Sequence, residues 1–129
     1  IGAIGGPTSG ADPIVSAVGV LAQQQNVPLG LFYIRKEAKG HGTGQQIEGG
    51  LPTDARVVIV EDAVTSGASA IRAIEAVREH GATIAGVICL VDREEGGRAK
   101  LEELGAPLVA AFTGPELLAA AKEAVAGAT

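Results

Sequence analysis

The sequence predicts an α/β fold, with a mostly parallel sheet that carries helices on both of its faces. Short, nearly continuous apolar segments alternate with segments whose apolar residues recur at helical spacing. Strands that are apolar throughout are typical of parallel sheets, because such sheets are buried on both faces. The 19 glycines suit the many tight connections of this arrangement. We expect five strands in a single domain that covers residues 1–129.

Local signals place the elements in order. Asp12 followed by Pro13 predicts the capped start of the first helix, Gly81 predicts the end of the second, and Thr113 with Glu116 forms a capping box before the last. The segment 36–50 has five glycines and no apolar period, so we expect a long loop there. The strands are expected at 1–5, 29–34, 56–60, 83–91 and 107–112, and the helices at 12–25, 70–80, 98–104 and 113–126.

Composition excludes several classes of protein. The net charge of −5 argues against a nucleic-acid surface. No apolar run reaches the roughly 18–20 residues of a membrane span, and no signal-peptide pattern is visible. The single Cys89 lies in an apolar run, so we expect a buried, unreactive thiol and a reducing, cytoplasmic setting. The chain has no Met and begins as if inside a strand, so we expect that an N-terminal portion is missing.

Residues 57–69 are the most informative stretch. Four β-branched residues lead to Glu61 and Asp62, and a short hydroxyl-rich turn follows before the next helix. Gly67 would let backbone N–H groups approach phosphate oxygens, and the helix start adds N–H donors. The two carboxylates can accept hydrogen bonds from ribose hydroxyls and help to hold Mg²⁺, directly or through water. The alternative is an ordinary strand-to-helix turn with two solvated acids.

This stretch resembles the phosphoribosyl pyrophosphate (PRPP) signature of type I phosphoribosyltransferases. The resemblance implies the Rossmann-like core of that family. It also implies that a five-residue loop holds the 5′-phosphate and that Glu61 and Asp62 hold the ribose, with Asp62 also counted as catalytic. The implied phosphate-binding residues are Thr65, Ser66, Gly67, Ala68 and Ser69.

Residues 34–44 form a second constellation, with three cationic side chains and a histidine among glycines. Such a loop attracts anions, and a diphosphate leaving group needs its charge neutralised as its bond breaks. A solvated flexible loop is the alternative. The pattern lacks the lysine of a Walker A motif, and no helix follows the glycines as a dinucleotide fingerprint would require.

The same loop resembles the catalytic loop of orotate phosphoribosyltransferases. The resemblance implies that Lys39 and His41 are catalytic and are contributed to the neighbouring subunit of a homodimer. Arg35 and Lys36 would then lie at the base of the loop, near the diphosphate. Arg72 and His80 are assigned no role and are expected on solvated surfaces.

Two further segments agree with the resemblance. Residues 6–13 are similar to the family's diphosphate loop but lack the lysine that some members carry, so backbone N–H groups and the Thr8 or Ser9 hydroxyls would have to serve. Arg93 matches an arginine that helps to bind the orotate carboxylate, a contact that can be bidentate. Without the resemblance, a surface ion pair with Glu94 or Glu95 is an equal alternative for Arg93.

The function implied is that of an orotate phosphoribosyltransferase or its catalytic core. It would join orotate to PRPP with Mg²⁺, giving orotidine 5′-monophosphate and diphosphate. Two alternatives stay open: a phosphoribosyltransferase for another base, and a PRPP-binding module without catalysis.

Overall fold

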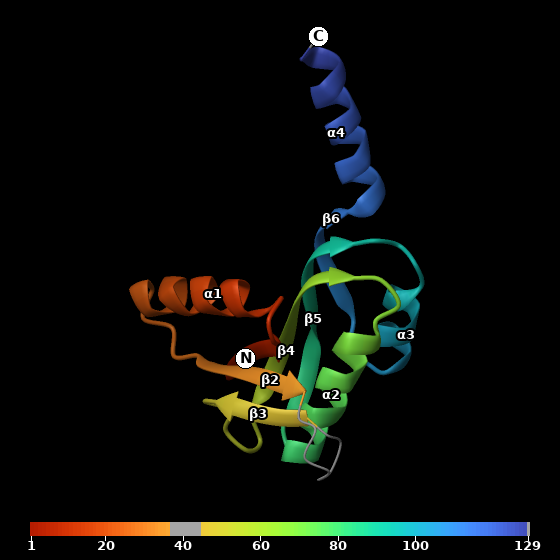
Figure 1. Ribbon diagram of the computed structural model, residues 1–129. Coiled ribbons are helices and arrows are strands. Elements are labelled where there is room, and N and C mark those ends of the chain that lie inside the picture. The colour runs from red at the N-terminus through yellow and green to blue at the C-terminus, as the bar shows by residue number, and fades with distance from the viewer. Residues whose placement is uncertain (37–44, 129) are drawn as a thin grey trace.

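A computed structural model describes residues 1–36 and 45–128 of the chain (Figure 1). Strands and helices alternate along most of it, as the sequence predicts. The strands are β1 (Ala3–Pro7), β2 (Gly30–Lys36), β3 (Gln45–Gly49), β4 (Arg56–Val64), β5 (Thr83–Asp92) and β6 (Leu108–Thr113). The helices are α1 (Asp12–Gln24), α2 (Ala68–His80), α3 (Gly97–Glu103) and α4 (Gly114–Gly127).

The strands form one sheet in the order β3-β2-β1-β4-β5-β6. Every pairing is parallel except that of β3, which runs antiparallel to β2 at the edge of the sheet. The expectation of five strands, with a loop throughout 36–50, was therefore wrong. The β3 segment contains a single large apolar residue, Ile47, so it gives no periodic signal of its own. Its pairing comes from the backbone groups that the edge strand β2 offers.

Helices cover both faces of the sheet, and each face has its own apolar core. Figure 1 shows α1 on one side and α2 with α3 on the other. The larger core includes Phe32, Ile59, Ile74 and Leu101, all at most 1% exposed, and packs between the sheet and α2 and α3. The smaller core, centred on Val15, lies under α1. The predicted arrangement of helices on both faces is confirmed.

The single cysteine lies in the larger core. Cys89 is 1% exposed, as expected for a residue of an apolar strand. Burial raises the pKa of the Cys89 thiol to about 11, so the thiol stays protonated near neutral pH. It is the thiolate that reacts, and the predicted lack of reactivity therefore agrees with this environment.

The C-terminal helix α4 extends away from the sheet (Figure 1). It begins with the predicted capping box: the Thr113 hydroxyl accepts from the Glu116 N–H at 3.2 Å, and the Glu116 carboxylate accepts from the Thr113 N–H at 3.0 Å. None of its described residues is buried. This helix is fixed by its local sequence rather than by packing.

Two predicted boundaries change where they affect the site. Strand β4 does not stop before the acidic pair but continues through Glu61 and Asp62 to Val64. Helix α1 begins at Asp12 itself, with Ala11 as the N-cap and no capping bond from a side chain, so the expected Asp12 cap was wrong. Within the part of the chain that the structure describes, no helix is long and apolar enough to span a membrane.

Candidate functional site

The connections after β1, β4 and β5 lie at the same edge of the sheet, because these strands are parallel and adjacent. Strand order changes direction between β1 and β4, where ligands bind in open parallel sheets. Close packing joins the first two connections: a Cβ placed on Gly10 would lie 2.6 Å from Oδ1 of Asp62. Parts of the segments that the sequence singled out, 6–13, 57–69 and 92–97, therefore meet at one edge.

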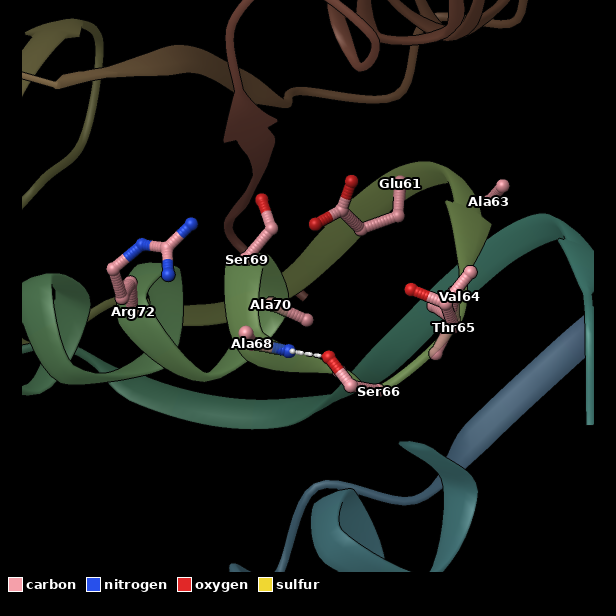
Figure 2. Close-up of a pocket in the computed structure, with 10 residues that line it drawn as sticks. Glu61, Ala63, Val64, Thr65, Ser66, Ala68, Ser69, Ala70 and Arg72 are labelled. Atoms are coloured by element: carbon pink, nitrogen blue, oxygen red, sulfur yellow. Dashed lines mark hydrogen bonds between the residues drawn. The ribbon is translucent and has the colours of Figure 1, made fainter. Parts of the chain in front are cut away.

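The 65–69 loop, which comprises Thr65–Ser69, encloses a hollow of about 210 Å³ together with the end of β4 and the start of α2 (Figure 2). Gly67 is the N-cap of α2 and has a φ of +84°, a conformation that glycine adopts without steric cost. The Ser66 hydroxyl accepts from the N–H of Ala68 at 3.4 Å. The helix N-terminus and the hydroxyl groups give the hollow several hydrogen-bond donors suited to a phosphate.

The two acids of β4 differ in their surroundings, because successive strand residues point to opposite faces. Glu61 is buried at 5% exposure and lines the hollow, whereas Asp62 is exposed and accepts from the Ala63 N–H at 2.8 Å. In Figure 2 the Glu61 carboxylate points toward Ser69. The sequence predicted both acids at the ribose, with Asp62 also catalytic, and gave no signal of this difference in burial.

Burial raises the pKa of Glu61 from its ordinary value of 4.5 to about 7. The negative charge of Asp62 raises the Glu61 pKa further, while the Ser69 hydroxyl and the Arg72 guanidinium lower it. A group with this pKa changes its protonation state near neutral pH. Strongly shifted groups of this kind often mark a functional site when they also line a pocket.

Arg72 is a pocket residue, although its position in the sequence predicts a solvated helix face. It lines the same hollow, three residues after Ser69 on α2 (Figure 2). Residues three apart lie on one face of a helix, so this spacing was the signal that could have found it. Arg72 adds a positive charge beside the 65–69 loop.

The 92–97 turn, which comprises Asp92–Gly97, is attached to the 65–69 loop region by two backbone hydrogen bonds. The Arg93 N–H donates to the Val64 carbonyl at 2.9 Å, and the Gly97 N–H donates to the Thr65 carbonyl at 3.0 Å. The Arg93 side chain is exposed, and its Nε lies 3.8 Å from a Glu95 carboxylate oxygen. An exposed pair at that distance contributes little to stability, so the guanidinium can contact a ligand.

Arg35 and Lys36 end β2 and line a second hollow of about 380 Å³ with Thr8 and Asp12. The Arg35 Nε forms an ion pair with Glu48 of β3 at 2.9 Å. The Thr8 hydroxyl is oriented toward the Ile34 carbonyl, at 3.5 Å. The residues expected near a diphosphate thus lie together at the end of β2. Lys39 and His41 lie outside the described residues.

Oxygen donors for a cation are few. Among residues 1–36 and 45–128, no group of three or more His, Cys, Asp or Glu side chains could hold a metal ion. In the acidic pair, Glu61 and Asp62 offer two carboxylates to a cation. That number fits Mg²⁺, which usually takes one or two carboxylates and completes its shell with phosphate oxygens and water.

Comparison with known families identifies the class of this chain. Residues 4–104 match the family model described as the phosphoribosyl transferase domain. The chain belongs to the phosphoribosyltransferase family. The residues matched include the 65–69 loop, the acidic pair and the 92–97 turn.

Individual relatives are more specific. The orotate phosphoribosyltransferase of Aquifex aeolicus is 48% identical over 116 residues, which cover 90% of this chain and 63% of that protein. The orotate phosphoribosyltransferase of a Nostoc species is 48% identical over 112 residues, which cover 86% of this chain and 54% of that protein. The chain thus spans between half and two thirds of the length of these relatives.

Similar solved structures also include orotate phosphoribosyltransferases. The orotate phosphoribosyltransferase of Aeropyrum pernix superposes with a TM-score of 0.76 at 38% identity, covering 93% of this chain and 64% of that one. The Mycobacterium tuberculosis orotate phosphoribosyltransferase in complex with PRPP superposes with a TM-score of 0.73 at 33% identity, covering 89% and 64%. These similarities confirm the predicted fold and family.

Proposed function

We propose that this chain is the catalytic core of an orotate phosphoribosyltransferase, which transfers the 5-phosphoribosyl group from PRPP to orotate. The observation that carries the proposal is the attachment of the 92–97 turn, through two backbone hydrogen bonds, to Val64 and Thr65, which line a hollow that also contains Glu61. A donor-rich loop with a pair of acids, and an exposed Arg93 guanidinium on the turn attached to that loop, suit a phosphorylated ribose next to a carboxylate-bearing acceptor. The similarity to orotate phosphoribosyltransferases supports the same assignment.

The ribose phosphate would occupy the hollow beside α2. The 65–69 loop binds the 5′-phosphate through backbone N–H groups and the hydroxyls of Thr65, Ser66 and Ser69, with the Arg72 charge nearby. Ionised Glu61 and Asp62 accept hydrogen bonds from the ribose hydroxyls. Their negative charge also stabilises positive charge that develops at the anomeric carbon.

The diphosphate would lie toward Arg35 and Lys36, whose charges stabilise the leaving group. Glu61 and Asp62 would help to hold Mg²⁺, directly or through water, and the ion would supply further neutralisation of the diphosphate charge. Lys39 and His41 are proposed to complete the site of the neighbouring subunit in a homodimer. The setting proposed for the enzyme is the cytoplasm.

The acceptor would lie beside the 92–97 turn, where the Arg93 guanidinium binds the orotate carboxylate. The bond between the anomeric carbon and the diphosphate breaks, a bond from that carbon to a ring nitrogen of orotate forms, and the proton of that nitrogen is released to the departing diphosphate or to solvent. The chain's contribution is to hold the two reactants in line and to stabilise charge.

A calorimetric titration with PRPP and Mg²⁺ tests the proposal at the 65–69 loop. Thr65→Val removes one hydroxyl from the loop and should weaken PRPP binding by about tenfold. Thr83→Val is the matched control, because the Thr83 hydroxyl lies at the opposite end of the sheet, 3.5 Å from the Ala55 carbonyl. Absence of PRPP binding to the unchanged chain would reject the proposal. PRPP binding without formation of orotidine 5′-monophosphate would support a binding module instead.

A further inference from the structure

The 92–97 turn is organised by an ion pair that none of the roles above uses. Asp92, at the end of β5, is only 2% exposed. Its Oδ2 accepts from the Arg98 Nε at 3.2 Å, and its Oδ1 accepts from the Glu94 N–H at 2.9 Å. Both carboxylate oxygens are thus engaged within the turn and its following helix, on either side of Arg93.

Arg98 makes a second contact that reaches the neighbouring strand. Its Nη1 donates to the Leu108 carbonyl at 2.7 Å, at the start of β6. A third contact, with Glu102, is long at 4.0 Å and exposed. The guanidinium therefore bridges the end of β5 and the start of β6, a geometry that the fixed fork of arginine provides and a lysine cannot reproduce.

The turn needs such support because its backbone is unfavourable. Glu94, which is not a glycine, has a φ of +59°. A non-glycine residue in the left-handed region costs free energy and persists only where surrounding contacts hold it. The bond from the Glu94 N–H to Asp92 is one such contact, and Asp92 is in turn held by Arg98.

We infer that Asp92 and Arg98 are positioning residues that set Arg93 against the 65–69 loop. Neither residue lines the hollow beside α2, so neither touches a phosphate bound there. They act through the turn, whose Arg93 and Gly97 amides bond to the strand and loop that surround the hollow. Loss of the pair should weaken acceptor binding and leave phosphate binding intact. The acceptor part of this inference rests on the proposed function, whereas the positioning of the turn does not.

Amide hydrogen exchange tests the positioning without any ligand. In Arg98→Met, exchange at the amides of Arg93 and Glu94 should accelerate by about tenfold or more. Arg78→Met is the matched control, because Arg78 also donates to a backbone carbonyl of the α3 region, that of Leu104 at 2.6 Å, away from the turn. The control should leave the turn amides unchanged. Unchanged exchange at Arg93 and Glu94 in Arg98→Met would overturn the inference.

Ligand binding tests the consequence for the acceptor. Orotidine 5′-monophosphate carries both the phosphate and the orotate group, whereas ribose 5-phosphate carries only the phosphate. Arg98→Met should weaken binding of the nucleotide by about tenfold and change that of ribose 5-phosphate by less than about twofold. Equal weakening of both probes would show a general structural effect and overturn the positioning role.

A conservative variant keeps the test decisive if Arg98→Met does not fold. Arg98→Lys retains the charge but can satisfy only one of the two contacts, with Asp92 or with Leu108, so its effects should be smaller and of the same kind. If the unchanged chain binds neither probe, the proposed function fails, while the exchange measurement still decides whether Arg98 positions the turn.

Discussion

Gly67 and Gly97 pack backbone against backbone where the 65–69 loop meets the 92–97 turn. A Cβ placed on Gly67 would lie 3.3 Å from the Cα of Gly97. A Cβ placed on Gly97 would lie 2.5 Å from a Val64 methyl carbon and 2.7 Å from the Thr65 carbonyl oxygen. The two segments can share hydrogen bonds only because neither position carries a side chain.

Gly97→Ala should therefore separate the turn from the loop. Overpacking against backbone typically costs about 1–3 kcal/mol, so we expect a loss of that size in the free energy of unfolding, together with weaker PRPP binding. Gly2→Ala is the control, because its Cβ would meet nothing nearer than 3.6 Å. Urea unfolding and PRPP calorimetry measure both effects. If Gly97→Ala behaved like Gly2→Ala, the close contact would not constrain the site.

Glu61 predicts a pH dependence of stability. Because its pKa is raised from 4.5 to about 7, the folded protein retains a proton that the unfolded chain has released. This contribution to stability is fully present below about pH 4.5 and is lost as the pH rises through about 7. Glu61→Gln removes the cost of ionising the buried group. The variant's advantage in unfolding free energy should be larger at about pH 8 than at about pH 5, by up to roughly 3 kcal/mol.

Urea unfolding at several pH values measures this difference, with the exposed Glu75→Gln as the control. A Glu61→Gln advantage that does not vary between the two pH values would show that Glu61 ionises normally. Glu61→Gln should also weaken PRPP binding at about pH 8, because an amide accepts hydrogen bonds less strongly than a carboxylate.

Arg93 predicts a selective effect on the acceptor. Arg93→Met should raise the KM for orotate by at least about tenfold, because a charged hydrogen-bonded contact is lost, and should change PRPP affinity by less than about twofold. Arg56→Met controls for the loss of a positive charge, because Arg56 begins β4 and lies at the end of that strand away from the acidic pair. An Arg93→Met enzyme with an unchanged KM for orotate would assign Arg93 to its ion pair with Glu95.

The loop carrying Lys39 predicts complementation between subunits. Asp62→Asn and Lys39→Ala chains should each have low activity. If Lys39 serves the neighbouring site, a mixed dimer has one site with neither change, so mixing should restore part of the activity. Activity measured across mixing ratios should pass through a maximum. Mixed dimers that form without any recovery would contradict the sharing of the loop.

The sequence predicted the parallel sheet and the 65–69 loop because both depend on local signals. The apolar residues of the strands indicate burial. Gly67 indicates a turn with a positive φ. Strand β3 was missed because its pairing depends on the free edge of β2 rather than on its own residues. Helix α4 was predicted well for the opposite reason, since its capping box is local.

The sequence predicted candidate site residues but not their surroundings. The acidic pair was predicted from motif spacing and Arg93 from the family resemblance, and their roles stay predictions. Motif spacing could not show that Glu61 is buried while Asp62 is exposed, because that difference depends on the packing of the sheet against α2. The ion pair of Asp92 with Arg98 was also missed, since it requires the fold to hold the Arg98 guanidinium of α3 between Asp92 and the Leu108 carbonyl.

Product formation from PRPP, Mg²⁺ and a choice of bases tests the central claim most directly. Supplied separately with orotate, uracil and hypoxanthine, the chain should consume PRPP and form a nucleotide only with orotate, giving orotidine 5′-monophosphate and diphosphate. Turnover with hypoxanthine or uracil and none with orotate would contradict the proposed acceptor and the role given to Arg93.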